Sequence, residues 1–583
     1  MHGGKCHESC IFMFGYRERF FQCGSSGQEW DRWAQMFSAE PPPERVGDKT
    51  YFMDASNKNL TFIPPSILEL WELEEAHLEN NALEGISKDI RNLTNLKILY
   101  LNNNNIRFLC KDLGELTNLR SLDLSNNPLI PSTLPVLSHL RALRQLRLYK
   151  IHLEHFPIQV CKCLHHLELL GLSHNRLKAL PKEIVNQTKM REIYLRNNRF
   201  EDFPQELCVL YNLEIVDLEQ NQIAVIPDEI SALTKLEKFF IASNCVTYLP
   251  DTLGSCSKLT ILDVSYNFLH NLPSTLKELT EITELGLSGN CLEKVPRLIC
   301  KWTLLRLLYM KSTCLKTLRR SFKRLLNITL LDLSQNYFDF FPIEICSLKN
   351  LEVLSLDDNR ICQVPPEVFN LVKLKALGLT GNNFTIFPEE ILLIESLEQL
   401  YLGQDQGTKL TYISENILKL TNLKELYCEN NNLEYLPVGI GSLRTLQLLD
   451  LHNNQIRELP DSICQLQGLK TLILENNYLS ELPENMDSLE SLEVLNLEGN
   501  PMEDPSEEVC KMGIPAIWNY LQEKRLMKVM ATKIQAWYRG VRVRREFEEM
   551  LKMLKKGKKS PKDKKEKEKK NEKAKPAPKG KKK

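Results

Sequence analysis

The chain has 583 residues, of which 43% are hydrophobic, and its formal net charge is zero. The zero hides an asymmetry: residues 524–583 carry 25 basic and 7 acidic residues, whereas the other 523 residues carry 50 basic and 68 acidic ones. No stretch reaches the roughly 18 apolar residues that a membrane-spanning helix needs, and the first fifteen residues lack the apolar core of a secretory signal. These features argue against a membrane or secreted protein and predict a cytoplasmic protein without a transmembrane segment.

The amino-terminal segment, residues 1–49, shows no repeat and little hydrophobic periodicity. Such segments rarely bury enough apolar surface to offset the entropy of ordering. We therefore expect residues 1–49 to be poorly ordered.

Residues 50–503 are dominated by an asparagine that recurs about every 23 residues within the pattern L-x-x-L-x-L-x-x-N-x-L. One copy contains Leu96, Leu99, Leu101 and Asn104. The recurring asparagines are Asn81, Asn104, Asn127, Asn175, Asn198, Asn221, Asn244, Asn267, Asn290, Asn336, Asn359, Asn382, Asn431, Asn454, Asn477 and Asn500. A fixed period of this length predicts a stacked array, in which each unit buries its apolar face against its neighbours.

Each unit of the array divides into two halves. The first half, such as Leu122 to Leu124, alternates in character and predicts a short strand whose leucines point inward. The asparagine that follows can both donate and accept hydrogen bonds, so the stacked amides are expected to form a ladder that satisfies buried turn backbone. The second half begins with Leu-Pro, as at Leu180 and Pro181, and predicts a helical or 3-10 turn.

With these features the array resembles the leucine-rich repeat, and its 23-residue unit resembles the intracellular, Ras-group repeats of signalling scaffolds. The resemblance covers about residues 50–525. It implies an α/β solenoid with parallel strands on the concave face and short helices or 3-10 turns on the convex face. We count nineteen full units after a degraded first unit near Met53. By analogy alone, the resemblance suggests a small GTPase as a partner.

Three places depart from the period. Ile151 and Thr313 stand where the ladder asparagine is expected, and three residues are inserted between Gln404 and Lys409. We expect local irregularities there, where a kink or a contact loop could lie. Tolerated drift in a long array is the simpler explanation.

The residue between the two strand leucines is expected to face the concave side, where tyrosines and aspartates dominate. Aromatic residues supply contact area at low entropic cost, and carboxylates select basic partners. One interpretation is a groove for an unidentified protein, and the other is that any exposed strand face must carry such residues. The first interpretation assigns protein binding to Tyr100, Asp123, Tyr194, Asp217, Phe240, Asp263, Tyr309, Asp332, Tyr401, Tyr427 and Asp450.

Several of the seventeen cysteines fall into columns of the repeat. One column holds Cys208, Cys300, Cys346 and Cys464, and another holds Cys245, Cys291 and Cys314. Equivalent positions one coil apart do not by themselves define a pairing scheme. We therefore interpret these cysteines as small apolar fillers in a reducing compartment.

Enzyme signals are weak. A local group of possible metal ligands is explained residue by residue by the repeat frame, so we expect no metal site; its members are His152, His155, Cys161, Cys163, His165 and His166. No glycine-rich phosphate loop and no nucleophile-base set can be argued. We predict a non-enzymatic protein without catalytic residues or a cofactor.

Residues 504–523 resemble the C-terminal cap of the same repeat group. Asp504, with Glu507 three residues later, predicts a helix N-cap. The apolar residues expected to cover the last coil are Val509, Ile514, Ile517, Trp518 and Leu521.

Residues 524–555 predict a basic amphipathic helix. Residues 531–545 read ATKIQAWYRGVRVRR and match I-Q-x-x-x-R-G-x-x-x-R at every defined position, which resembles the IQ motif. Residues 524–545 contain eight basic residues and no acidic one, as suits an acidic, Met-lined groove. A mid-helix glycine costs about 0.5–1 kcal/mol relative to alanine, so Gly540 suggests a close partner backbone.

The IQ resemblance implies binding of calmodulin or a calmodulin-like light chain, often without calcium. It makes Ile534 the apolar anchor, gives Gln535 a hydrogen bond to the partner's backbone, and pairs the motif arginines with its carboxylates. The full set of candidate residues is Ile534, Gln535, Trp537, Tyr538, Arg539, Gly540, Val541 and Arg544. A membrane-surface helix and a plain capping helix are the alternatives. Array and motif together resemble the leucine-rich repeat and IQ domain-containing proteins.

The last segment, residues 556–583, consists almost entirely of Lys, Glu, Pro and Gly, and residues 552–583 hold seventeen lysines. We expect this tail to be disordered. It lacks aromatic residues for base stacking, so no specific nucleic acid is predicted. A solubilising role and binding to an acidic surface are equally compatible with it.

These elements predict an intracellular scaffold in signal transduction that holds one protein in its groove and calmodulin on its IQ helix. The alternative is a cytoskeletal or ciliary anchoring protein that uses the lysine tail. A regulatory variant of the first hypothesis has the basic tail fold onto the acidic concave face until calmodulin displaces it.

Overall fold

The computed structural model describes residues 51–404 and 408–556. Three predictions therefore fall outside the described residues. They concern the poorly ordered segment 1–49, the insertion at residues 405–407 and the lysine tail beyond Lys556. The chain forms two compact units, one reaching to Asn432 and one starting at Leu433.

The described part of the first unit contains one short strand in each coil. The strands are β1 Phe52–Asp54, β2 Glu75–His77, β3 Ile98–Tyr100, β4 Ser121–Asp123, β5 Gln145–Arg147, β6 Leu169–Gly171, β7 Glu192–Tyr194, β8 Ile215–Asp217, β9 Lys238–Phe240, β10 Ile261–Asp263, β11 Glu284–Gly286, β12 Leu307–Tyr309, β13 Leu330–Asp332, β14 Val353–Ser355, β15 Ala376–Gly378, β16 Gln399–Tyr401 and β17 Glu425–Tyr427. Neighbouring strands pair in parallel with equivalent residues opposite each other, as Leu99 opposite Leu122 shows.

A short helix follows most strands. These helices are α2 Pro65–Leu68, η2 Lys88–Asn92, η3 Lys111–Glu115, η4 Pro131–His139, α3 Ile158–Cys163, η5 Lys182–Asn186, η6 Gln205–Val209, η7 Asp228–Ala232, η8 Asp251–Ser255, η9 Ser274–Glu278, η10 Ile299–Lys301, η11 Arg320–Arg324, η12 Ile343–Ser347, η13 Pro366–Asn370, η14 Glu389–Leu393 and η15 Glu415–Lys419. Proline commonly precedes the first helical residue, as Pro181 does with φ −66°. Its fixed φ suits the start of a helical turn.

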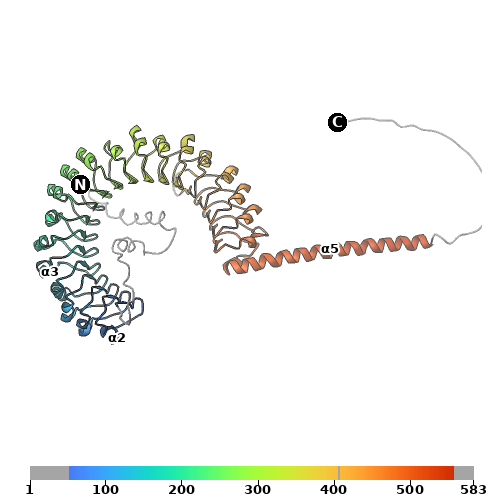
Figure 1. Ribbon diagram of the computed structural model, residues 1–583. Helices are drawn as coiled ribbons and strands as arrows, with labels where there is room; N and C mark the ends of the chain where they lie inside the picture. The colour runs from blue at the N-terminus through green and yellow to red at the C-terminus, as the bar shows by residue number, and fades with distance from the viewer. Residues whose placement is uncertain (1–50, 405–407, 557–583) are drawn as a thin grey trace, which may run out of the picture. The chain divides into compact units, whose positions relative to one another are not determined.

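The first unit is a curved ribbon whose strands line the inner side and whose 3-10 helices lie on the outer side (Figure 1). Between them, leucines of both halves are fully buried, for example Leu99, Leu101 and Leu113. The predicted α/β solenoid with parallel concave strands and convex 3-10 turns is confirmed.

The predicted asparagine ladder is present. Asn104 donates through Nδ2 to the carbonyls of Leu78 and Leu101, both at 3.0 Å, and its Oδ1 accepts from the Leu83 amide at 3.0 Å. Each ladder amide thus joins its own coil to the preceding one. An aliphatic residue cannot make these bonds, and buried backbone groups left without partners are costly.

A second row of amides, which the sequence analysis missed, runs one residue before the ladder. Asn80, Asn103 and Asn126 all have φ between +54° and +57°. Asn103 donates to Asn80 and Asn126 donates to Asn103, each at 2.7 Å. Asparagine tolerates this left-handed conformation, and that tolerance was the available sequence signal.

The irregular coils keep the sheet intact. β4, β5 and β6 still pair in register around Ile151, as β11, β12 and β13 do around Thr313. The turns absorb the change: Asn175 Oδ1 accepts from the amides of both Ile151 and Leu153, at 3.2 and 3.0 Å. The third irregularity falls on the residues after Gln404, of which 405–407 lie outside the described residues.

The cysteine interpretation is half wrong. Cys208, Cys300 and Cys346 are buried as expected of apolar fillers. In the other column, however, Cys245 and Cys291 are exposed. That column directly follows the ladder position, where the chain leaves the core, so a filler role does not explain it.

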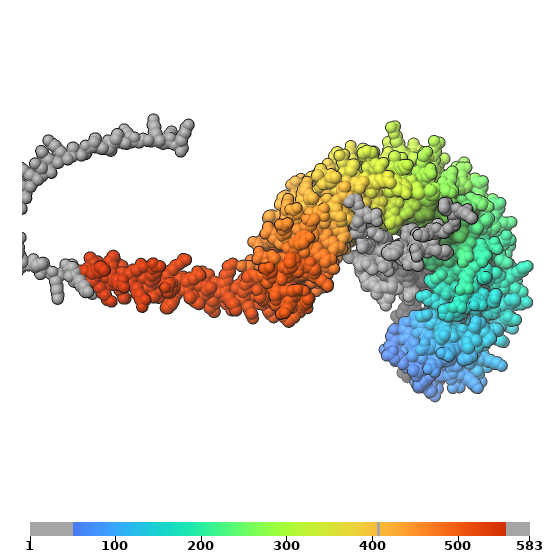
Figure 2. Space-filling model, turned by 180° about the vertical axis from the view of Figure 1, so that it is seen from behind, coloured from blue at the N-terminus to red at the C-terminus, as the bar shows by residue number. Residues whose placement is uncertain are grey.

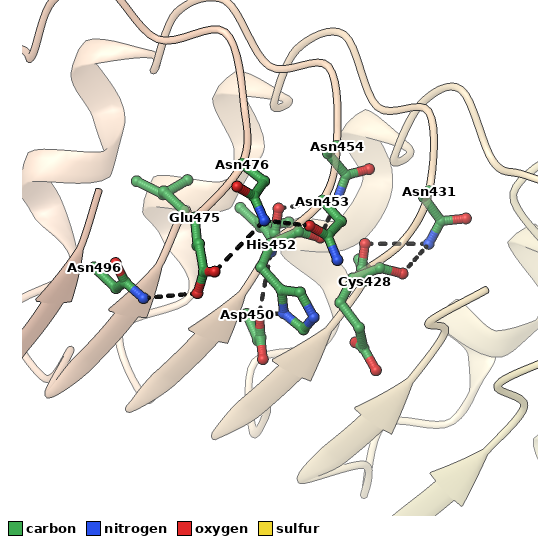
Figure 3. A network of polar contacts seen from close by, with 12 residues as sticks. Cys428, Asn431, Asp450, His452, Asn453, Asn454, Glu475, Asn476 and Asn496 are labelled. Carbon is green, nitrogen blue, oxygen red and sulfur yellow. Dashed lines mark hydrogen bonds and ion pairs between the residues drawn. The ribbon is translucent and has the colours of Figure 1, made fainter. Parts of the chain in front are cut away.

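The second unit repeats the same coil and then changes to helix. Its elements are η16 Val438–Ser442, β18 Leu448–Asp450, η17 Asp461–Gln465, β19 Thr471–Ile473, η18 Met486–Ser488, β20 Val494–Asn496, α4 Glu507–Lys511 and α5 Ile514–Lys556. Its amide row continues, because Asn476 donates to Asn453 at 2.8 Å (Figure 3). No helix among the described residues is long and apolar enough to cross a membrane.

The predicted N-cap at Asp504 is wrong. Helix α4 begins after Ser506, whose side chain makes no capping bond. Asp504 instead accepts from the Tyr520 hydroxyl at 2.8 Å and pairs with Lys524. The carboxylate is drawn to α5 because a charged partner there binds it more strongly than a backbone amide.

Candidate protein-binding surfaces

The predicted concave residues occupy the third position of their strands. Strand register places Tyr100 opposite Asp123, Tyr194 opposite Asp217, and Tyr401 opposite Tyr427. In the first unit these side chains are half-buried rather than exposed. They therefore form one row along the inner side, as the alternation of the strands required.

Two flanking rows were missed by the sequence analysis. Residues two before and two after the predicted row share its face, and they carry charges of both signs. Arg196 and Glu219 form an ion pair of 2.9 Å in one flanking row. Tyr194 donates to Glu192 of the other flanking row at 2.8 Å. The period of two along each strand was the signal that would have found them.

The concave aspartates are already engaged by the chain's own backbone. Asp123, Asp217, Asp263 and Asp332 each accept through Oδ1 from the amide two residues further on, at 2.9–3.0 Å. This local bond closes the end of the strand. The aspartates therefore have a structural reason to be there, besides any role in partner selection.

Burial also changes the charge of this face. Loss of solvent raises the pKa of Asp217 to about 6 and that of Asp357 to about 7, although backbone and Ser355 hydroxyl bonds oppose the rise. Asp217 and Asp357 are consequently less fully ionised near neutral pH than ordinary aspartates.

The glycines on this face leave no hollow, because a neighbouring side chain occupies the space beside each of them. A Cβ at Gly171 would overlap the Tyr149 hydroxyl, and one at Gly286 would overlap Asp263 Oδ1. The neighbouring side chain thus lies over each glycine. Aromatic rings add flat surface where Tyr401 and Tyr427 stack, with centroids 4.6 Å apart and planes at 11°.

A half-buried histidine, also missed from the sequence, ends strand β2. The His77 ring packs between Phe52 and Tyr100, with centroid distances of 5.2 and 4.8 Å. It lies 2.7 Å from Glu75 and 3.6 Å from Glu79. Burial lowers the pKa of His77, but bonds to the two glutamates outweigh this effect and raise it.

In the second unit, the predicted concave residue Asp450 is buried. It accepts from the amide of His452 at 3.1 Å and lies 2.7 Å from the ring nitrogen Nδ1 of the same residue (Figure 3). Its carboxylate is thus held within its own coil.

The base of α5 is fixed to the last repeat of its own unit. Ile517 and Leu521 are buried against that coil. Arg525 binds Asp487 through two nitrogens, with Nη2 2.6 Å from Oδ2, and Lys528 lies 2.6 Å from Glu484. Burial and ion pairs together set the direction of the helix.

The IQ residues lie on the free part of the same helix, which extends as a rod beyond the repeats of its unit (Figure 2). Ile534, Trp537 and Tyr538 are 64–65% exposed, and their spacing places them on one side. Within the described chain, the motif arginines hydrogen-bond only to the helix itself, as Arg544 does to the Gly540 carbonyl at 3.3 Å.

Gly540 has no structural reason to be a glycine. A Cβ there would meet only Arg544 Nη2, at 3.7 Å, which is an ordinary contact. Gln535, Arg539 and Arg544 are exposed, while Gly540 and Val541 are half-buried by neighbouring side chains. The structure therefore brings all eight predicted residues onto one exposed helical segment.

The candidate metal cluster is dispersed. Cys161 is buried whereas Cys163 is exposed, and His166 instead approaches Lys189 Nζ at 2.9 Å. Among the described residues, no group of three or more His, Cys, Asp or Glu is placed to hold a metal ion.

Two sequence families match the chain. One, described as leucine-rich repeat region, matches residues 287–434 and 411–556, and another, described as leucine rich repeat, matches residues 71–129. Both matches fall on the coils described above. The chain folds as a leucine-rich-repeat solenoid.

Curated relatives support a narrower resemblance. The leucine-rich-repeat chain is 59% identical to leucine-rich repeat and IQ domain-containing protein 4 of Homo sapiens over 169 residues, which are 29% of this chain and 30% of the relative. Identity to the protein of the same name in Mus musculus is 55% over 169 residues, covering 29% of this chain and 28% of the relative. The chain thus spans less than a third of either relative. The resemblance predicted from the sequence is confirmed over that span.

The chain is also similar in fold to solved structures. A crystal structure of a TDR receptor aligns with a TM-score of 0.53 at 23% identity, covering 77% of this chain and 85% of that one. Identity at this level shows the shared leucine-rich-repeat architecture alone.

Proposed function

We propose that this leucine-rich-repeat protein is a non-enzymatic, cytoplasmic scaffold in signal transduction. Its concave strand face binds one protein, and the IQ motif of α5 binds calmodulin or a calmodulin-like light chain. The curated relatives carry an IQ domain in their names, which agrees with this assignment.

One observation carries the calmodulin part of the proposal. Three large side chains, Ile534, Trp537 and Tyr538, stay about two-thirds exposed on one face of a helix whose base is fixed. Large contiguous apolar surface left in water marks an interaction site. A basic helix with such a face is the kind of target that calmodulin enfolds.

The ion pairs at the base of α5 indicate which positive charges remain for the partner. Of the eight basic residues between 524 and 545, Lys524, Arg525 and Lys528 are paired with acidic residues of the last repeat or of the cap that follows it. Of the five basic residues between 533 and 545, Arg542 pairs with Glu546 of the same helix at 3.0 Å. The positive charge not engaged by the repeats therefore lies over the motif. This placement favours a protein that binds the motif rather than a membrane surface, because a membrane would attract the whole basic stretch.

Titration of the full chain with calmodulin, in calcium and in a chelator, tests this proposal. Ile534→Glu is expected to weaken binding by about 100-fold, because it places a charge in the apolar groove of the partner. Leu526→Glu is the matched control, since Leu526 is 58% exposed on α5 but lies outside the motif. Absence of a complex in both conditions, or equal loss in both variants, would contradict the proposal.

The concave part is carried by the stacked Tyr401 and Tyr427 and tested separately. Proximity labelling with the full chain and with Tyr427→Ala compares captured proteins. Loss of one partner, with calmodulin binding unchanged, supports the groove. An unchanged set of labelled proteins argues that this face serves only to build the coil. A small GTPase is a partner to examine first, by analogy.

The lysine-rich tail favours a second candidate, cytoskeletal or ciliary anchoring, because seventeen lysines in residues 552–583 would bind an acidic polymer through counterion release. Co-sedimentation with microtubules, compared between the full chain and a chain ending at Met550, separates this function from the first. Equal sedimentation of both chains would exclude the tail as the anchor.

A further inference from the structure

Cys291 and Cys314 lie one coil apart on the surface of the first unit. Their Sγ atoms are 3.4 Å apart, Cys291 is exposed, and Cys314 is half-buried. Each follows the ladder position of its coil, which is Asn290 in the first case and Thr313 in the second.

The backbone holds these two thiols side by side. The Glu293 amide donates to the Thr313 carbonyl at 3.2 Å, so the two coils are in direct contact there. Neighbouring strands lie about 4.8 Å apart. That spacing falls within the Cα separation of about 4.4–6.8 Å that a disulfide bridges without backbone movement.

The same seam lacks the usual ladder bonds. In a regular coil the asparagine donates to a carbonyl of the preceding coil, as Asn336 does to Met310 at 2.9 Å. Thr313 cannot reach back in this way, because its hydroxyl donates to Met310 of its own coil at 2.7 Å. A bond between Cys291 and Cys314 would join the two coils where the side-chain link is missing.

We propose that Cys291 and Cys314 form a reversible disulfide when the protein meets a hydroperoxide. The Cys291 thiolate attacks one oxygen of hydrogen peroxide, the O–O bond breaks, and Cys291 becomes a sulfenic acid. The departing hydroxide takes up the proton that the Cys291 thiol had released and leaves as one water. The Cys314 sulfur then attacks the Cys291 sulfur, the S–O bond breaks, and the hydroxide leaves as a second water with the Cys314 proton. Two thiols lose two electrons, and hydrogen peroxide gains them.

The order of the two steps follows from exposure. Burial raises the pKa of Cys314, and its hydrogen bond with Cys291 raises it further, so Cys314 is protonated more completely than an ordinary thiol. Cys291 is the more accessible sulfur and meets the oxidant first. Cys314 then resolves the sulfenic acid.

Peptide mapping of the full chain after hydrogen peroxide treatment and alkylation tests the proposal. Trypsin places Cys291 in the peptide 278–294 and Cys314 in the peptide 312–316. We expect loss of both alkylated peptides and the appearance of one linked peptide in monomeric protein, which dithiothreitol reverses. Cys291→Ser and Cys314→Ser should each abolish the linked peptide.

Cys245 supplies the internal control. It is exposed and occupies the same column, but the next coil carries Phe268 at that position. Its alkylation should stay unchanged while that of Cys291 and Cys314 falls. Absence of the linked peptide, or loss of the Cys245 thiol to the same extent, overturns the proposal.

Discussion

The concave strand row and the IQ face of α5 differ in how far their polar and aromatic side chains are buried and hydrogen-bonded by the chain itself. On the concave row, Asp123 and Asp217 are half-buried and bound by their own strand ends, and Tyr194 donates to Glu192. On α5, Ile534 and Trp537 are about two-thirds exposed. The folded chain accounts for the first set, whereas nothing within its described part accounts for the second.

This difference teaches how far sequence motifs carry function in a repeat protein. A strand face must be satisfied locally, so its polar residues serve the coil before they serve a partner. An isolated helix has no such demand, and apolar residues kept in water there need an external reason. The experiments below test both halves of this comparison.

The largest expected effect concerns a residue that serves the coil alone. Asn267→Ala removes two donated bonds of 3.0 Å and one accepted bond of 2.9 Å from buried backbone groups. We expect a loss of about 3 kcal/mol in the free energy of unfolding, measured by urea denaturation.

The matched control for that change is Asn118→Ala. Asn118 is exposed and makes one bond, to the Thr94 carbonyl at 2.8 Å. Its loss should cost less than about 1 kcal/mol. Equal effects at the two sites would show that the ladder is not what holds the coils together.

The base of α5 should behave like the repeats rather than like the motif. Arg525→Met removes the paired bonds to Asp487, so we expect a loss of about 1 kcal/mol and faster hydrogen exchange in residues 514–530. Calmodulin binding should stay within about twofold, because the motif lies beyond this contact. A large loss of calmodulin binding would show that the base of α5 and the motif do not act independently.

The same pair predicts an acid dependence. The Arg525 guanidinium lowers the pKa of Asp487 below its usual range. The stability from this carboxylate is present above its unfolded pKa and is lost as pH falls through the lowered folded pKa. Arg525→Met should reduce the dependence of the free energy of unfolding on pH in this acidic range. An unchanged dependence would show that Asp487 does not contribute.

Gly540→Ala should change stability and binding in opposite directions. The free helix is expected to gain about 0.5–1 kcal/mol, because the Cβ has room and alanine favours helix. Calmodulin binding should fall by about fivefold if the partner backbone packs against Gly540. Helicity by circular dichroism and the dissociation constant measure the two effects. A gain in both would remove the functional reason for this glycine.

The smallest expected effect is at His77. Its pKa is raised in the folded protein, so its contribution is fully present below the unfolded value and is lost as pH rises through the folded pKa. Stability should therefore decline slightly from mildly acidic to neutral pH. His77→Gln should remove this dependence, and NMR titration of the ring reports the pKa directly. A ring that titrates below its ordinary range would contradict the assignment.

Much of the fold was predictable because the repeat is periodic. The ladder bonds of Asn104 and the turn after Pro181 are present as expected, and the strand expected at residues 122–124 lies one residue earlier, at Ser121–Asp123. Local features failed where two partners competed: Asp504 left its predicted cap for Tyr520 and Lys524. The exposed cysteine column was misread because a repeat frame gives the position of a residue but not its depth.

The eight IQ residues could be named from the resemblance to the IQ motif, but their exposure could not. Only packing shows that Lys524, Arg525 and Lys528 pair with acidic residues at the end of the repeat array, which leaves the basic residues of the motif unengaged by the described repeats. Similarly, burial rather than composition weakens the charge of Asp217 and Asp357.

The order of residues alone determined the stacked coil, its ladder and the amphipathic helix, because each depends on contacts at a fixed separation along the chain. Tertiary structure decided which polar groups remain for a partner, how strongly the concave carboxylates ionise, and that Cys291 meets Cys314. Those properties depend on solvent exclusion and on distances between coils, and a linear pattern contains neither.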